Sequence, residues 1–227
     1  MKNRLSQYLA EFIGTYFMVF FGCGSMIMAE TLPGYSSSAV PVIWGGAVSI
    51  MIYAVGHISG AHFNPAVTIA FWATRKLPGP RLPGYLFSQL SGALLASMTH
   101  LLIFGSGHHF GMTSPSIALL PTFLIEVIAS FSLMFVIMSV ATDSRAVGEL
   151  AGIAIGSTVA INAFVVGPLT GASMNPARSF SPAIFSGSTE SLWIYLTAPI
   201  IGAITGAFVY NWIKCDSKEE SDSTGCC

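Results

Sequence analysis

Two copies of one stretch decide how this chain folds: Gly56-His-Ile-Ser-Gly-Ala-His-Phe-Asn-Pro-Ala-Val-Thr68 and Gly167-Pro-Leu-Thr-Gly-Ala-Ser-Met-Asn-Pro-Ala-Arg-Ser179. Each contains an Asn-Pro-Ala triplet, at Asn64-Pro65-Ala66 and at Asn175-Pro176-Ala177, directly before a short apolar run. Asn is a favoured N-cap residue, and Pro is favoured at the first helical position because its missing N–H has no intrahelical partner there. Both triplets are therefore predicted to begin helices.

Apolar runs of two lengths account for most of the chain. The short runs, 64–74 and 175–185, fall below the roughly 20 residues that a helix needs to cross a bilayer. The long runs cover 5–29, 40–58, 84–104, 118–141, 148–166 and 191–213. Of the 227 residues 53% are hydrophobic and only 8% charged, whereas a soluble domain has about 25% charged residues. The sequence predicts an all-α membrane protein with six transmembrane helices and two re-entrant half-helices.

The two halves of the chain also repeat outside the triplets. Leu9-Ala-Glu-Phe12 parallels Leu124-Ile-Glu-Val127, so the chain divides into repeats of about 5–110 and 118–213. Each repeat holds three long runs, and an odd number of spans turns the second copy upside down relative to the first. We expect one channel domain over residues 1–227, in which the half-helices enter from opposite faces.

Lys and Arg residues set the expected orientation, because cytoplasmic loops of membrane proteins are enriched in both. All except Arg178 fall on one side of the predicted layout: Lys2, Arg4, Arg75, Lys76, Arg81, Arg145, Lys214 and Lys218. Both termini, including a polar tail at 214–227, are therefore predicted to be cytoplasmic. The membrane would be the cell membrane, either a plasma membrane or a bacterial inner membrane.

The segments before the triplets carry the expected pore chemistry. Non-helical backbone at membrane depth is tolerated only where it lines a watery cavity or is buried in protein. The half-helix N-termini would place about half a positive charge each at the midplane and so disfavour cations and protons. The carboxamides of Asn64 and Asn175 can donate to neutral solutes. The expected accepting carbonyls belong to Gly60, Ala61, His62, Phe63, Gly171, Ala172, Ser173 and Met174.

Three intramembrane charges remain. Arg178 opposes the dipole of its own half-helix, and Val67 stands at the matching place of the first repeat, so a solute-contacting role is favoured over a structural ion pair. Glu11 and Glu126 occur in both repeats. This symmetry favours a scaffold role, in which the carboxylates accept hydrogen bonds from the re-entrant backbone, over proton relay.

Other functional classes find no support in the residue pattern. No nucleophile and base, phosphate loop or metal-ligand cluster is visible, so neither an enzyme nor a metal or other cofactor is expected. His108 and His109 lie in an outer loop without a nearby Cys or carboxylate in sequence and are expected to be solvated. The net charge of −1 offers no basic face for nucleic acid, which leaves the lipid bilayer as the implied partner.

The paired triplets resemble the major intrinsic protein superfamily of aquaporins and glycerol facilitators, from Tyr8 to Trp212. Within it, the chain is most similar to the nodulin-like intrinsic proteins of plants and their bacterial relatives, through 10–17, 141–152 and 167–184. The resemblance implies the aquaporin fold, a homotetramer with one pore per subunit, and passage of small neutral solutes and water.

The resemblance also implies an outer selectivity filter at Trp44, Ala163, Ala172 and Arg178. Water-selective members would show Phe, His, and Cys or Thr beside the Arg, so a Trp and two Ala imply a wider slot. Glycerol, urea and metalloid hydroxides such as boric or arsenous acid are the solutes expected to pass with water, and protons and ions are expected to be excluded. Ser179 and Ala183, however, resemble the water-channel pattern, whereas glycerol facilitators have an acid and a base at these positions.

Three alternatives stay open at this point. One is a water-selective aquaporin, another is a secondary transporter built from broken helices, and a third is a junction protein with a closed pore. A transporter should carry a coupling carboxylate in its central pathway, and the only intramembrane acids of the sequence are Glu11 and Glu126. Solute flux without an ion gradient would distinguish a channel from a transporter.

Overall fold

Eight α-helices and two 3-10 turns make up the regular structure of the described residues, 2–143 and 147–214, in this computed structural model. They are α1 (Lys2–Thr31), α2 (Ala39–Ser59), α3 (Pro65–Ala73), η1 (Gly79–Arg81), α4 (Leu82–Phe104), α5 (Leu119–Thr142), η2 (Gly148–Leu150), α6 (Ala151–Thr170), α7 (Pro176–Ser186) and α8 (Leu192–Ile213). Arg145, Lys218 and the tail beyond Lys214 lie outside the described residues.

Six of these helices are long and apolar enough to cross a membrane, which confirms the predicted spans. The other two, α3 and α7, are the predicted half-helices. Their N-caps are the two Asn side chains: Asn64 Oδ1 accepts from Ala66 N at 2.9 Å, and Asn175 Oδ1 accepts from Ala177 N at 3.0 Å. Each cap satisfies an N–H that has no partner inside its helix.

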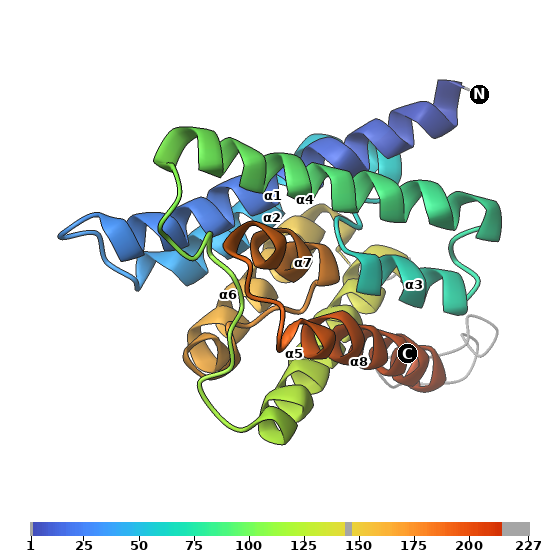
Figure 1. Cartoon of the computed structure of the whole chain (residues 1–227). Helices are drawn as coiled ribbons and strands as arrows, with labels where there is room; N and C mark the ends of the chain where they lie inside the picture. The colour runs from blue at the N-terminus through green and yellow to red at the C-terminus, as the bar shows by residue number, and fades with distance from the viewer. Residues whose placement is uncertain (1, 144–146, 215–227) are drawn as a thin grey trace, which may run out of the picture.

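The helix contacts show the inverted repeat. Within the first half α1 packs against α4, and within the second half α5 packs against α8 in the same way. Helices α2 and α6 join the halves. Figure 1 shows the short helices among the longer ones, and each contacts one long helix of either half: α3 packs on α4 and α8, and α7 on α8 and α4.

Close helix packing depends on glycines at matching places in the two halves. A Cβ added to Gly92 in α4 would overlap the carbonyl oxygen of Phe12 in α1. A Cβ on Gly202 in α8 would likewise overlap the carbonyl oxygen of Val127 in α5. Small residues let helix backbones approach closely, which is how helices associate in lipid.

The outer surface of the long helices is apolar. Trp212 is 84% exposed, Leu102 79% and Phe87 75%. A water-soluble protein rarely exposes such large side chains over contiguous surface. The outer surface is therefore matched to a lipid bilayer, and the polar groups are gathered inside.

Candidate pore between the half-helices

Two irregular loops, 60–63 and 171–174, precede the half-helices and share one backbone conformation. The φ angles are positive at the same three places of each loop: Gly60 (90°), Ala61 (51°) and Phe63 (50°), and Gly171 (84°), Ala172 (44°) and Met174 (52°). Positive φ is unfavourable for residues other than Gly, so surrounding contacts must hold these loops in place.

The carboxylate of Glu11 holds the first loop. Its oxygens accept from His62 N at 2.9 Å and from Phe63 N at 2.7 Å. Gln89 Nε2 donates to the same carboxylate at 2.8 Å, and Glu11 is completely buried. A buried carboxylate is tolerated because several donors replace its lost water.

The carboxylate of Glu126 does the same for the second loop. It accepts from Ser173 N at 2.9 Å, Met174 N at 3.0 Å and the Thr170 hydroxyl at 2.7 Å. A tyrosine of the long helix that follows each half-helix also binds the backbone at the start of the loop. Tyr85 Oη in α4 donates to Ser59 O at 2.6 Å, and Tyr195 Oη in α8 donates to Thr170 O at 2.7 Å. Both loops are thus tied to the long helices.

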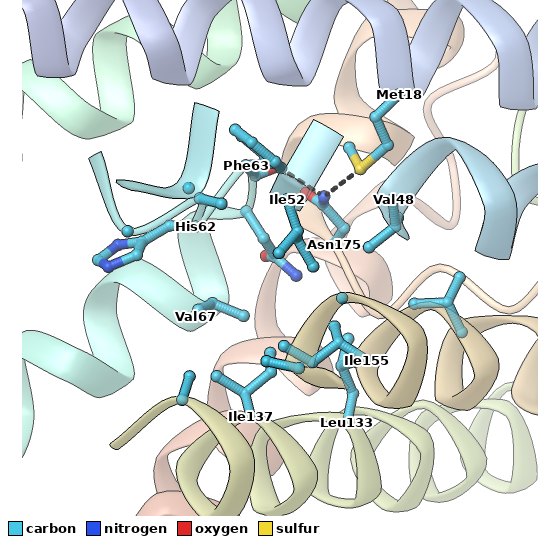
Figure 2. Close-up of a pocket in the computed structure, with 18 of the residues that line it drawn as sticks. Met18, Val48, Ile52, His62, Phe63, Val67, Leu133, Ile137, Ile155 and Asn175 are labelled. Carbon is cyan, nitrogen blue, oxygen red and sulfur yellow. Dashed lines mark hydrogen bonds between the residues drawn. The ribbon is translucent and has the colours of Figure 1, made fainter. Parts of the chain in front are cut away.

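The two Asn carboxamides bond across the meeting point of the half-helices. Asn64 Nδ2 donates to Met174 O at 2.7 Å, and Asn175 Nδ2 donates to Phe63 O at 2.9 Å. A carboxamide nitrogen carries two hydrogens, so one on Asn64 is left for a further acceptor, whereas Asn175 directs its second hydrogen at the sulfur of Met18. Figure 2 shows Asn175 beside Phe63, with the sulfur of Met18 at 4.0 Å from its Nδ2.

A cavity of about 470 Å³ lies against the two Asn residues. The loop residues His62 and Phe63 line it on one side. Apolar side chains of other elements line it as well, and Figure 2 labels Val48, Ile52, Val67, Leu133, Ile137 and Ile155. A solute there meets hydrogen-bonding groups as well as aliphatic carbon.

A second cavity, of about 440 Å³, adjoins the first. Its other lining residues include Met26 and Ala29 of α1, and Ser37 and Ser38 before α2. Four residues line both cavities: Trp44 of α2, Ala163 of α6, Ala172 of the second loop, and Arg178 of α7. These four form the wall between the cavities, which we call the shared wall.

Arg178 is held in the shared wall by neutral groups. Its Nη1 donates to Gly111 O at 2.9 Å and its Nη2 to Gly171 O at 3.4 Å and to the sulfur of Met26 at 3.2 Å. The guanidinium carbon lies 4.9 Å from the ring centroid of Trp44. Arg178 is 2% exposed, and no carboxylate of the described residues lies within ion-pair distance of it.

The loop between α4 and α5 brings Gly111 to Arg178. Its anchor is His109, whose N and Nδ1 lie 3.2 Å and 2.8 Å from the carboxylate oxygens of Glu30 at the end of α1. The His109 side chain is 71% exposed, as expected, and the fold adds a carboxylate that lies 79 positions away in the chain.

Three contributors to the shared wall carry no sequence signal. Gly111 acts through its backbone carbonyl, and Met26 through a sulfur atom in an otherwise apolar span. Gly22 makes room for Trp44, because a Cβ there would overlap the indole. Of the three, only Met26 acts through side-chain atoms, and nothing in the sequence of an apolar span distinguishes it from the other methionines.

Comparison with known proteins agrees with this architecture. The chain matches the family description "Major intrinsic protein" over residues 1–210. It is 50% identical to nodulin-26 of Glycine max, over 97% of this chain and 82% of that one, and 49% identical to aquaporin NIP1-1 of Zea mays, over 94% and 77%.

Its fold is also similar to the crystal structure of the aquaglyceroporin from Plasmodium falciparum. The TM-score is 0.82 at 25% sequence identity, over 92% of this chain and 96% of that one. The helices, the paired half-helix loops and these similarities agree: the chain belongs to the major intrinsic protein family, whose members are membrane channels for water and small solutes and not enzymes.

Proposed function

We propose that this channel passes small uncharged solutes larger than water, with glycerol, urea, boric acid and arsenous acid as candidates, as well as water itself. The observation that carries the proposal is the composition of the shared wall. Two of its four residues, Ala163 and Ala172, end at the β-carbon and leave the space that larger side chains would fill.

The other two residues of the shared wall supply the contacts in this proposal. The indole of Trp44 covers the carbon face of a solute, and Arg178 donates to its hydroxyl or carbonyl oxygen. Beyond the shared wall, the Nδ2 groups of Asn64 and Asn175 receive the solute next, and on Asn175 the solute replaces the long contact with the Met18 sulfur. Chemistry of this kind suits neutral molecules that combine hydroxyl groups with a short carbon skeleton.

Ion exclusion follows from the same groups in this proposal. The N-termini of α3 and α7 meet where the two Asn carboxamides bond across, and each brings about half a positive charge. Arg178 adds a full charge nearer the second cavity. A cation or proton therefore meets two successive electrostatic barriers.

A water-selective pore is the second candidate, because Ser179 resembles the water-channel pattern. Its hydroxyl accepts from Thr113 Oγ1 at 2.8 Å and lies 2.6 Å from Ser173 Oγ. These contacts tie the outer loop to the second re-entrant loop and give Ser179 a structural task. We therefore rank this candidate below the wide pore.

We further propose a homotetramer in the plasma or inner membrane, with one pore per subunit. The single channel domain would consist of the repeats at about 5–110 and 118–213, with both termini and the polar tail 214–227 in the cytoplasm. The one-sided distribution of Lys and Arg supports this orientation.

The test is stopped-flow transport of water, glycerol, urea, boric acid and arsenous acid by reconstituted protein. The decisive variant combines Ala163→His with Ala172→Cys, which fills the shared wall; Cys is chosen because the positive φ at position 172 disfavours a β-branched residue. We expect glycerol flux to fall at least about tenfold, about 1.4 kcal/mol of added barrier, and water flux to fall much less.

Ala29→His is the matched control, since Ala29 lines only the second cavity. It should leave the ratio of glycerol to water flux near that of the wild type. If the wild-type protein conducts water and excludes every larger solute of the panel, the water-selective pore replaces the proposal.

A further inference from the structure

Met26 places a thioether sulfur beside the shared wall. The residue lies in α1 and lines the second cavity. Its sulfur accepts a hydrogen bond from Nη2 of Arg178 at 3.2 Å. The side chain is only partly buried and lines the second cavity, so molecules that fill the cavity contact it.

The other described methionines whose sulfur accepts a hydrogen bond differ from Met26. Met18 lines the first cavity and is 4% exposed, and its sulfur lies 4.0 Å from Asn175 Nδ2. Met112 accepts from the Ser186 hydroxyl at 3.2 Å and lines neither cavity. Among the described methionines, only Met26 combines a place in the lining of a cavity with a contact between its sulfur and Arg178.

A thioether is a weak hydrogen-bond acceptor that oxidants convert to a sulfoxide. The sulfoxide is polar, and its oxygen is a much better acceptor than the sulfur that it replaces. A thioether sulfur has two lone pairs; the Arg178 contact uses one, which leaves the other for an oxidant. Hydrogen peroxide is small, uncharged and rich in hydrogen-bonding groups, as the chemistry of the cavities requires.

We propose that Met26 is a site of oxidative modification by hydrogen peroxide, and that its sulfoxide narrows the channel at the shared wall. The sulfur attacks one peroxide oxygen, the O–O bond breaks, and the S–O bond forms. The second oxygen leaves as water after it takes up the proton of the transferred hydroxyl. The sulfur loses two electrons, and the peroxide gains them.

The consequence for transport follows from the geometry. The new oxygen lies within reach of Arg178 and accepts from its Nη2, which holds the guanidinium and the added oxygen together beside the opening. The effect on glycerol and other large solutes rests on the proposed function of the shared wall. The oxidation of Met26 and its effect on water flux do not depend on that proposed function.

The experiment exposes proteoliposomes of the full chain to hydrogen peroxide and follows two readouts. Sequencing of peptide fragments by tandem mass spectrometry should find a gain of about 16 Da, one oxygen atom, on Met26 itself earlier than on Met18 and Met112. Stopped-flow measurements should show severalfold lower glycerol flux and a smaller loss of water flux. Dithiothreitol should not restore either flux, because thiols reverse cysteine oxidation and leave the sulfoxide in place.

Matched variants assign the effect. Met26→Leu removes the sulfur and keeps an apolar side chain, and its ratio of treated to untreated flux should stay near one. Met112→Leu should lose flux on treatment as the wild type does. Met26→Gln, which carries a polar oxygen permanently, should show low glycerol flux without peroxide.

Three results would overturn the proposal: no oxidation of Met26, oxidation without any change in flux, or equal sensitivity in Met26→Leu. Restoration by dithiothreitol would also reject it and assign the effect to cysteine. A wild-type protein that passes water alone would refute the proposed solute range, whereas Met26 oxidation and water flux would still decide this proposal.

Discussion

Arg178 carries a charge at a depth where charge is costly, roughly 2.5–3.5 kcal/mol on insertion scales. The first repeat shows that the fold does not need it, because Val67 stands at the matching place. The structure offsets the cost with the carbonyl oxygens of Gly111 and Gly171, the sulfur of Met26 and the face of Trp44. None of these groups is an anion, so the positive charge is not neutralised.

Removal of this charge should therefore open the pore to cations. We expect Arg178→Val to admit protons or small cations that the wild type excludes, because one of the two electrostatic barriers is lost. A pH-sensitive dye inside proteoliposomes reports the leak. Arg81→Val is the control, since Arg81 lines neither cavity. A folded Arg178→Val protein that stays proton-tight and keeps its solute fluxes would assign Arg178 to structure.

The buried acids Glu11 and Glu126 have the opposite character. Each carboxylate accepts hydrogen bonds from two backbone N–H groups of a re-entrant loop and a third from a side-chain donor. Neither acid lines either cavity, so neither faces the cavities as a free carboxylate. These contacts support the scaffold role over proton relay.

At the scale of elements, the joint between the two halves is the packing of α2 against α6. Gly45 and Gly156 face each other there, and a Cβ on either would overlap the carbonyl oxygen of the other. Trp44 and Ala163 stand on the same two helices. Their separation across the shared wall therefore depends on how closely these helices approach.

Gly45→Ala should push α2 and α6 apart and destabilise the protein by about 1–3 kcal/mol, as overpacking of a close contact does. The neighbouring Gly46 is the control, since a Cβ there meets nothing within 4 Å. Gly46→Ala should leave stability equal or higher, because Ala favours a helix over Gly by up to about 1 kcal/mol. Thermal unfolding in detergent compares the two. Equal melting temperatures would show that this joint adapts without cost.

At the scale of the whole molecule, the six spans and the inverted repeat put the connecting loops on alternate sides. We expect cysteines placed at Ser36 and Ser106 to react with an impermeant maleimide from outside the cell, and one at Lys76 to react only from inside. All three positions are exposed. Cys215, Cys226 and Cys227 are replaced by Ser beforehand so that only the new thiols report.

The reverse labelling pattern would invert the proposed orientation and place both termini outside. Labelling of Lys76→Cys from both sides would instead contradict a single orientation. Because Cys23 is buried, it can stay in place.

The elements of the fold could be read from the sequence because their causes are local. A span is an apolar run of bilayer length, and an Asn-Pro pair caps and starts a helix whatever surrounds it. Observed helices α2, α3 and α7 begin and end within a residue or so of the expected runs. The repeated triplets and the odd number of spans in each half also determined the inverted repeat.

Only the tertiary structure shows which side chains and backbone carbonyls contact one another inside the pore. Arg178 contacts Gly111, which lies 67 positions away in the chain, and Met26, which lies 152 positions away. The carboxamides of Asn64 and Asn175 each donate to a carbonyl of the opposite loop. A backbone carbonyl looks the same in every residue, and one Met in an apolar span looks like any other. The sequence determined the spans and half-helices because the bilayer and the helix caps act on neighbouring residues, whereas the shared wall exists only where distant segments pack together.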